Sequence, residues 1–184
     1  MTTSYTPGPG LIGLTQIGGQ TGKLIRFGQW LNGDGFSDWE HAFVTLGGGL
    51  IAEAEPGGAR VASLSEYSDV WWCRNIAALA APGRLQDIAE AATAYAQAGP
   101  WGPHGVPYSF LDYAALAARR LHASDPALRR YIATSRHMIC SQLADQAYQD
   151  AGVSVFTDKR WTGDVTPWDL YVRDVELGKA RGLS

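Results

Sequence analysis

A glycine triplet, Gly47 to Gly49, restricts the fold of this chain more than any other feature, because it stands between two short runs with high β-propensity. The runs are His41 to Leu46 and Leu50 to Glu55. Glycine adopts left-handed backbone conformations without steric cost, so the pattern predicts an antiparallel hairpin that turns at the triplet.

The rest of the chain predicts an early sheet and late helices. Further strands are expected at residues 60–62 and 69–76, and residues 1–20, rich in Gly, Pro and Thr, read as an irregular N-terminal arm. Helical spacing of apolar residues or capping signals predict helical segments at 21–31, 82–97, 108–123, 138–152 and 166–171. We therefore expect one α+β domain over residues 1–184, with a small antiparallel sheet or barrel packed against helices.

Composition excludes several classes of protein. The chain has 184 residues, 46% of them hydrophobic, which suffices for one buried core. A net charge of −3 argues against a nucleic-acid binder and against a polybasic membrane-surface protein. No signal peptide or membrane-spanning run is visible, so the expectation is a protein that is cytoplasmic as synthesised, with export or phage-mediated delivery left open.

Nucleophilic chemistry at a cysteine is the best candidate among the reactive residues. The four histidines and two cysteines show no metal-ligand spacing, and no phosphate-binding glycine loop is present. Cys140 falls at the expected start of a helix, where backbone amides lower a thiol pKa and can hold an oxyanion. The alternative is that Cys140 is a small buried hydrophobic residue. Cys73 lies in an apolar run and reads as core.

A base and an acid for that cysteine are expected on the hairpin. With the turn at the triplet, Glu53 opposes Phe43 and Glu55 opposes His41, so both glutamates lie on the face that carries the histidine. A carboxylate there would fix the tautomer of His41 and stabilise the imidazolium. A change of one residue in turn length would exchange the two glutamates, so both remain candidates. The alternative is that these residues form an ordinary exposed polar face of the hairpin.

Five motifs occur in order along the chain and together span residues 38–170, which is most of its length. They are Asp38-Trp39-Glu40-His41-Ala42-Phe43-Val44, the run from Leu50 to Val61, Gly105-Val106-Pro107-Tyr108-Ser109-Phe110, Ile139-Cys140-Ser141-Gln142-Leu143, and Val165-Thr166-Pro167-Trp168-Asp169-Leu170. This set of motifs resembles the circularly permuted NlpC-type papain-like hydrolases, including YiiX-like proteins and, distantly, the lecithin:retinol acyltransferase branch. The family's usual pattern has a small polar residue at Glu40 and a glutamate at Gln142.

The resemblance implies a papain-like fold and a catalytic triad. Cys140 would be the nucleophile, His41 the general base, and Glu53 the third member in preference to Glu55. Substrate contacts are expected from Tyr108, which matches a tyrosine of the family's cleft, and from Trp39, Ser141 and Glu55. The implied acyl-enzyme mechanism requires no cofactor and no metal.

These expectations favour a cysteine hydrolase that cleaves an amide bond in a peptide such as a peptidoglycan stem peptide. Two alternatives stay open: a lipid or acyl ester or thioester hydrolase or acyltransferase of the same fold, and a catalytically retired module that binds a peptide or protein. The expected partner is thus a peptide or acyl substrate rather than a nucleic acid, and the sequence leaves the oligomeric state undetermined.

Overall fold

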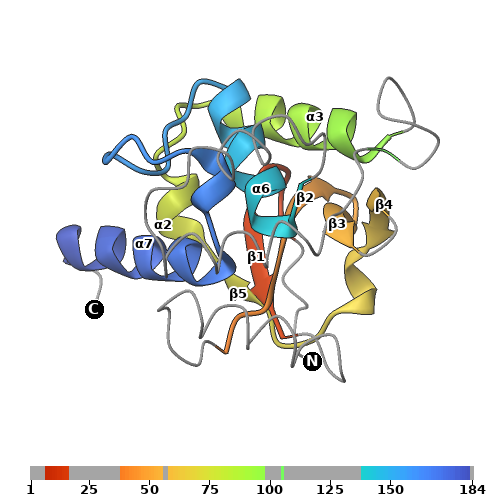
Figure 1. The fold of residues 1–184 in the computed structure, drawn as a ribbon, viewed down its shortest axis with the longest axis horizontal. Coiled ribbons are helices and arrows are strands. Elements are labelled where there is room, and N and C mark those ends of the chain that lie inside the picture. Colours follow the sequence, from red (N-terminus) through yellow and green to blue (C-terminus); the bar gives the residue numbers. More distant parts are fainter. Residues whose placement is uncertain (1–6, 17–37, 56–57, 98–104, 106–137, 183–184) are drawn as a thin grey trace, which may run out of the picture.

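The protein is built around a five-stranded antiparallel sheet with the strand order β4-β3-β2-β1-β5 (Figure 1). The computed structural model describes residues 7–16, 38–55, 58–97, 105 and 138–182. The strands are β1 (Ile12–Thr15), β2 (His41–Gly47), β3 (Leu50–Glu55), β4 (Gly58–Ser63) and β5 (Trp71–Trp72). The expected α+β class is therefore confirmed.

The predicted hairpin forms between β2 and β3. The glycines of the triplet have φ angles of +86°, +60° and +79°, all in the left-handed region. Phe43 pairs with Glu53, which is the predicted register. The alternation that follows puts Ala42, Val44 and Ala52 on one face of the sheet and His41 on the other.

The prediction of an irregular arm over residues 1–20 is wrong for residues 12–15, because they form β1 between β2 and β5. Ile12 and Leu14 are fully buried, and β1 pairs along β2 from Ile12 opposite Val44 to Thr15 opposite His41. The strand is only four residues long. Its stability comes from these long-range pairings, which the surrounding Gly- and Pro-rich composition conceals.

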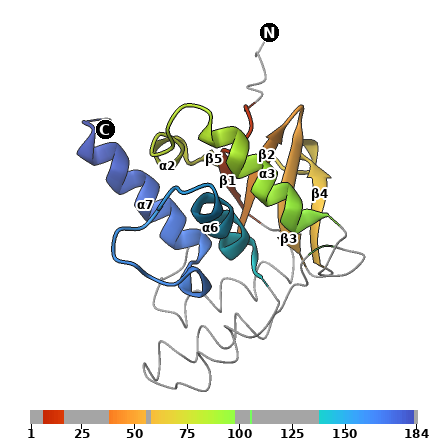
Figure 2. The same ribbon diagram turned by 90° about the horizontal axis from the view of Figure 1, so that it is seen from above.

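Helices α3 (Arg84–Ala96) and α6 (Cys140–Asp150) cover one face of the sheet, and both lie on the same side of the strands in Figure 2. The main core between these layers contains Ile12, Leu14, Val44, Ile88 and Leu143. The expected helices at 82–97 and 138–152 are confirmed. Gly152, with φ +75°, follows the end of α6 as a glycine C-cap does.

A second, smaller apolar cluster covers the opposite face. Phe43, Ile51 and Ala62 of the sheet pack against Leu64, Tyr67, Val70 and Trp72, which belong to η1 (Leu64–Glu66) and the segment after it. His41 and Glu53 lie on this face of the sheet. The segment that follows β4 therefore helps to enclose the polar pair.

The prediction of a strand over residues 69–76 is wrong for most of that range. Only Trp71 and Trp72 form β5, and the chain then turns into the short helix α2 (Arg74–Ala77). Asp174 supplies the reason: its Oδ1 accepts the backbone N–H groups of Asn75 at 2.8 Å and Ile76 at 3.0 Å. This carboxylate belongs to a helix that is distant in sequence and caps the start of α2. No local sequence pattern therefore predicts that the strand ends here.

The C-terminal helix α7 (Pro167–Ala180) extends well beyond the expected turn at 166–171. Its start matches the prediction, since the side chain of Thr166 accepts the N–H of Asp169 and the Asp169 carboxylate accepts the N–H of Thr166. The expected helices at 21–31 and 108–123 lie outside the described residues. None of the described helices has the length and hydrophobicity required to cross a membrane.

Gly13 provides a test of the packing between β1 and the smaller apolar cluster around Phe43. A Cβ atom at Gly13 would stand 2.4 Å from two ring carbons of Phe43, whereas one at Gly8 would meet nothing within 4 Å. We expect Gly13→Ala to lower the free energy of unfolding by about 1–3 kcal/mol through overpacking. Gly8→Ala, the matched control, should change it by less than about 0.5 kcal/mol. Urea unfolding measures both, and equal stability of the two variants would contradict the packing described.

Candidate functional site

His41 and Glu53 form a buried hydrogen-bonded pair across the β2–β3 hairpin. The Nε2 atom of His41 lies 2.8 Å from Oε2 of Glu53, and the two residues are 1% and 0% exposed. The pair is diagonal, because Glu53 stands directly opposite Phe43. Of the two glutamates that the sequence left open, Glu53 therefore contacts the imidazole.

Cys140, the first residue of α6, interacts with the same imidazole. It is fully buried, and its hydrogen bond and its charge both act on His41. Because Nε2 of His41 is bonded to Glu53, Nδ1 is the ring nitrogen available to the sulfur. Strand β2, strand β3 and the start of α6 thus bring the three residues together, and His41 interacts with both Glu53 and Cys140.

The environment of His41 favours its protonated form. Burial is the largest single influence and lowers the pKa of the imidazole. The charge and hydrogen bond of Cys140, followed by those of Glu53, outweigh burial and raise the pKa of His41 to about 10. The contacts of His41 with Cys140 and Glu53 therefore favour an imidazolium at this site.

Glu53 is held ionised in spite of its burial. Burial raises the pKa of its carboxyl, but His41, the hydroxyl of Tyr67 and the charge of Arg60 together bring that pKa below its usual value. The hydroxyl of Tyr67 donates to Oε2 at 2.6 Å, and Nη2 of Arg60 lies 2.7 Å from Oε1. The Arg60 contact is an ion pair that is not aligned as a hydrogen bond.

Glu55 occupies the rim of this cluster. Its side chain is 32% exposed, its Oε2 lies 3.1 Å from Nε of Arg60, and its Oε1 lies 3.2 Å from the hydroxyl of Tyr67. Glu55 is accessible enough to contact a substrate, and it belongs to the same ion-pair network as Glu53. Its role in substrate binding stays a prediction.

The donor atoms of His41, Glu53 and Glu55 lie within 4.8 Å of one another, the kind of spacing that metal ligands have. Two features argue against reading this group as a metal site. His41 Nε2 is already bonded to Glu53, and Arg60 lies within 2.7 Å of one carboxylate and 3.1 Å of the other. The guanidinium therefore supplies the positive charge that the two carboxylates require.

Ser141 and Gln142 attach the start of α6 to the segment before α7. The hydroxyl of Ser141 donates to the carbonyl of Val165 at 2.7 Å, so its side chain has a structural role in the fold. The Gln142 amide accepts from the N–H of Ile139 at 3.1 Å and donates to the carbonyl of Gly163 at 3.0 Å. A glutamate at this position could not donate the second bond.

Three further residues that the sequence singled out are Trp39, Tyr108 and Glu40. Trp39 packs against Trp71 and Tyr171, with ring centroids 6.1 Å and 6.0 Å apart, and is partly buried. Tyr108, expected to line the cleft, lies outside the described residues. Glu40, where the resembled pattern has a small polar residue, is fully buried and has interactions of its own.

Sequence reasoning missed Arg60 and Tyr67. The β3–β4 register puts Arg60 directly opposite Glu53, and β-alternation on a correctly placed third strand would have found it. Tyr67 follows η1 in a segment without periodicity, so no local signal indicated that its hydroxyl reaches Glu53.

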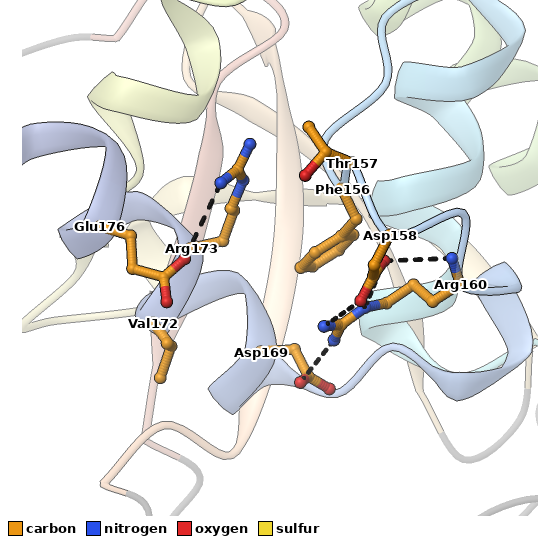
Figure 3. A pocket seen from close by; sticks show the side chains of 8 residues that line it. All are labelled: Phe156, Thr157, Asp158, Arg160, Asp169, Val172, Arg173 and Glu176. Atoms are coloured by element: carbon orange, nitrogen blue, oxygen red, sulfur yellow. Dashed lines mark hydrogen bonds and ion pairs between the residues drawn. The ribbon is translucent and has the colours of Figure 1, made fainter. Parts of the chain in front are cut away.

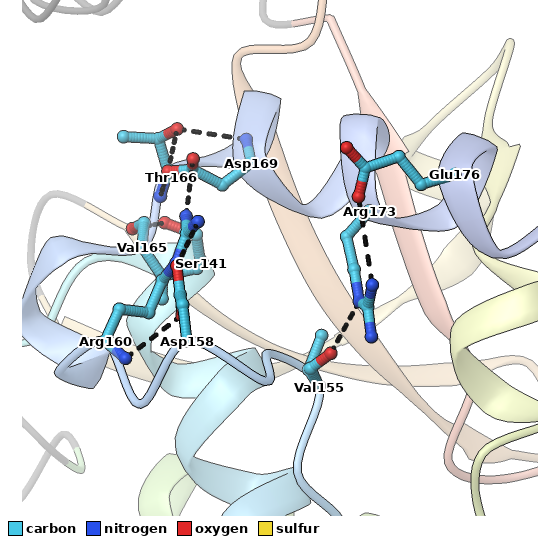
Figure 4. Close-up of polar contacts among 9 residues, drawn as sticks. All are labelled: Ser141, Val155, Asp158, Arg160, Val165, Thr166, Asp169, Arg173 and Glu176. Carbon is cyan, nitrogen blue, oxygen red and sulfur yellow. Dashed lines mark hydrogen bonds and ion pairs between the residues drawn. The ribbon is translucent and has the colours of Figure 1, made fainter.

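A cavity of about 140 Å³ lies between α7 and the segment before it, lined by Phe156, Thr157, Asp158, Arg160, Asp169, Val172, Arg173 and Glu176 (Figure 3). Its arginines already have partners. Arg160 pairs with Asp158 and Asp169 at 2.8 Å, and Nε of Arg173 donates to the carbonyl of Val155 (Figure 4). Asp169 also caps α7 at Thr166. These ion pairs and hydrogen bonds connect the cavity to residues 165 and 166, to which Ser141 is also bonded through Val165. They therefore stabilise the fold around the start of α7.

Comparison with known proteins adds no family assignment. A scan against protein-family models found no match to this chain, and a search of curated proteins found no match either. The functional argument therefore depends on the motifs of the sequence and on the contacts among Cys140, His41 and Glu53.

The protonation of His41 can be measured directly. In the wild type, ¹⁵N NMR of the imidazole should show His41 protonated at pH 8 and deprotonating only as the pH rises through about 10. Cys140→Ala should lower this pKa, because the contributions of the sulfur disappear while the burial that lowers the pKa remains. Cys73→Ala is the control and should leave the titration unchanged. A His41 pKa that is the same with and without Cys140 would show that the two side chains do not interact.

Proposed function

We propose that this protein is a cysteine hydrolase of the papain-like type that cleaves an amide bond through a Cys140–His41–Glu53 triad. The observation that carries the proposal is the continuous contact from Cys140 to His41 and from His41 Nε2 to Glu53 Oε2, all of it buried. A nucleophile, a base and an acid in hydrogen-bond contact are what nucleophilic catalysis requires.

In the proposed mechanism the Cys140 thiolate attacks the carbonyl carbon of the substrate, and a carbon–sulfur bond forms. The backbone N–H groups of the first turn of α6 have no carbonyl partner within the helix, which makes them suitable donors to the oxyanion. His41 gives its Nδ1 proton to the departing amine, and the carbon–nitrogen bond breaks. Nδ1 then takes a proton from water, whose oxygen attacks the thioester and releases Cys140 as thiolate.

The substrate class rests on the resemblance of the motifs to NlpC-type hydrolases. It favours a peptide amide bond, with peptidoglycan stem peptides, at bonds adjoining D-Glu or diaminopimelate, as the first class to assay. Soluble stem peptides incubated with the wild type should yield two fragments by mass spectrometry. Cys140→Ala should reduce their formation on the order of 10³-fold or more, since removal of a covalent nucleophile abolishes the acyl-enzyme route.

A peptide- or protein-binding module is the second candidate, and the burial of the site favours it. Both Cys140 and His41 are almost inaccessible to solvent, whereas a working nucleophile must be reached by a carbonyl carbon. The reactivity of Cys140 distinguishes the two candidates without knowledge of the substrate.

Iodoacetamide alkylation followed by mass spectrometry measures that reactivity. An ordinary thiol with a pKa near ~8.5 is almost entirely protonated at pH 6. If Cys140 is paired with an imidazolium, its rate at pH 6 should exceed that of the His41→Ala variant by roughly tenfold or more. Cys73 is the internal control: burial and the charge of Asp174 raise the pKa of its thiol, so it should stay unlabelled. A Cys140 that is inert, or that is indifferent to His41, would favour the binding module.

A further inference from the structure

The carboxylate of Glu53 has two hydrogen-bond donors on one oxygen and a guanidinium charge beside the other. Its Oε2 accepts from Nε2 of His41 at 2.8 Å and from the hydroxyl of Tyr67 at 2.6 Å, while Nη2 of Arg60 lies 2.7 Å from Oε1. The resemblance that suggested the triad assigns no role to Tyr67 or Arg60. Their polar contacts in the described part of the chain are with Glu53 and with the neighbouring carboxylates of Glu55 and Glu66.

Packing fixes the position of the Tyr67 hydroxyl. The Tyr67 ring stacks on Phe43 with centroids 5.4 Å apart, and its centroid is 5.6 Å from that of His41. The phenol has a single proton, and the shorter contact, to Glu53, receives it. Burial and the two neighbouring glutamates raise the pKa of Tyr67 far above its usual value, so the hydroxyl remains a donor at every relevant pH.

Arg60 supplies the positive charge that compensates the carboxylates around Glu53. It extends from β4 opposite Glu53 and also lies 3.1 Å from Glu55 and 2.8 Å from Glu66. Burial lowers the pKa of its guanidinium, but these carboxylates raise it further, so the positive charge is permanent. Arg60 therefore offsets the repulsion that Glu55 and Glu66 would otherwise exert on the buried charge of Glu53.

We propose that Tyr67 and Arg60 are positioning residues that keep Glu53 ionised and directed at His41 during the part of the cycle in which His41 is neutral. This inference rests on the proposed function. After His41 has given its Nδ1 proton to the leaving group, the imidazolium no longer stabilises the carboxylate. Tyr67 and Arg60 still do, so Nε2 keeps its proton in the bond to Glu53 and Nδ1 stays free to accept a proton from water.

The effect of losing these donors follows from the groups that face Glu53. They are His41 from β2, Arg60 from β4, Tyr67 after η1, and Glu55 on its own strand; Cys140 acts through His41 and Glu66 through Arg60. Burial favours a protonated Glu53, and His41, Tyr67 and Arg60 oppose it. Removal of the Tyr67 hydroxyl should therefore raise the pKa of Glu53 and move any loss of function in acid to higher pH.

Tyr67→Phe tests this, because it deletes the hydroxyl and keeps the ring that packs on Phe43. We expect Cys140 alkylation to fall roughly tenfold at pH 5 and less than about twofold at pH 8, as loss of one hydrogen bond to a charged group implies. Tyr95→Phe is the matched control, since Tyr95 donates to the carboxylate of Asp150 at 2.6 Å near the opposite end of α6. Its alkylation profile should equal that of the wild type.

A second measurement does not depend on cysteine chemistry. The carboxyl ¹³C signal of Glu53 should titrate at higher pH in Tyr67→Phe and in Arg60→Gln than in the wild type, and Arg60→Lys should restore much of the Arg60 effect by keeping the charge. Unchanged Glu53 titration together with an unchanged alkylation profile would overturn the inference. If Cys140 of the wild type is itself unreactive while Glu53 responds as expected, the proposed hydrolase fails and the role of Tyr67 and Arg60 in holding the carboxylate stands.

Discussion

A buried ionised carboxylate must be compensated within the protein, and the candidate site is organised around that constraint at Glu53. With 0% of its surface exposed, Glu53 receives an imidazole N–H, a phenol O–H and a guanidinium charge from three different parts of the chain. Each contact is strong because solvent is excluded, and each lost contact would be costly for the same reason. The hairpin, β4 and the segment after η1 must therefore all be in place before the site exists.

The packing of the layers determines which side chains reach the candidate site. Strand β2 presents alternate residues to two faces, so Ala42 and Val44 enter the core under α3 and α6 while His41 turns to the smaller cluster. His41 begins the strand and Cys140 begins α6, and the two residues meet at one end of this central strand. Ser141 and Gln142 then fasten the start of α6 to residues 163–165, which limits the movement of the sulfur relative to the imidazole.

Local patterns predicted the parts of the structure that depend on local physics. The glycine triplet fixed the turn and hence the register of Phe43 with Glu53, because left-handed backbone at three successive residues leaves few other arrangements. Helical spacing found α3 and α6, and the Thr166 cap marked the start of α7. The failures have a common cause: β1 depends on pairing with distant strands, and α2 depends on the distant carboxylate of Asp174.

The sequence by itself determined which reactive residues were available and that His41 and a glutamate would share one face of a hairpin, since alternation along a strand is a local property. Only the tertiary structure decided that Glu53 rather than Glu55 bonds to the imidazole, that Cys140 is buried against it, and that Arg60 and Tyr67 complete the set. Those contacts join segments separated by up to 99 positions along the chain, from His41 to Cys140. Their geometry is set by how the layers pack, and no local spacing encodes it.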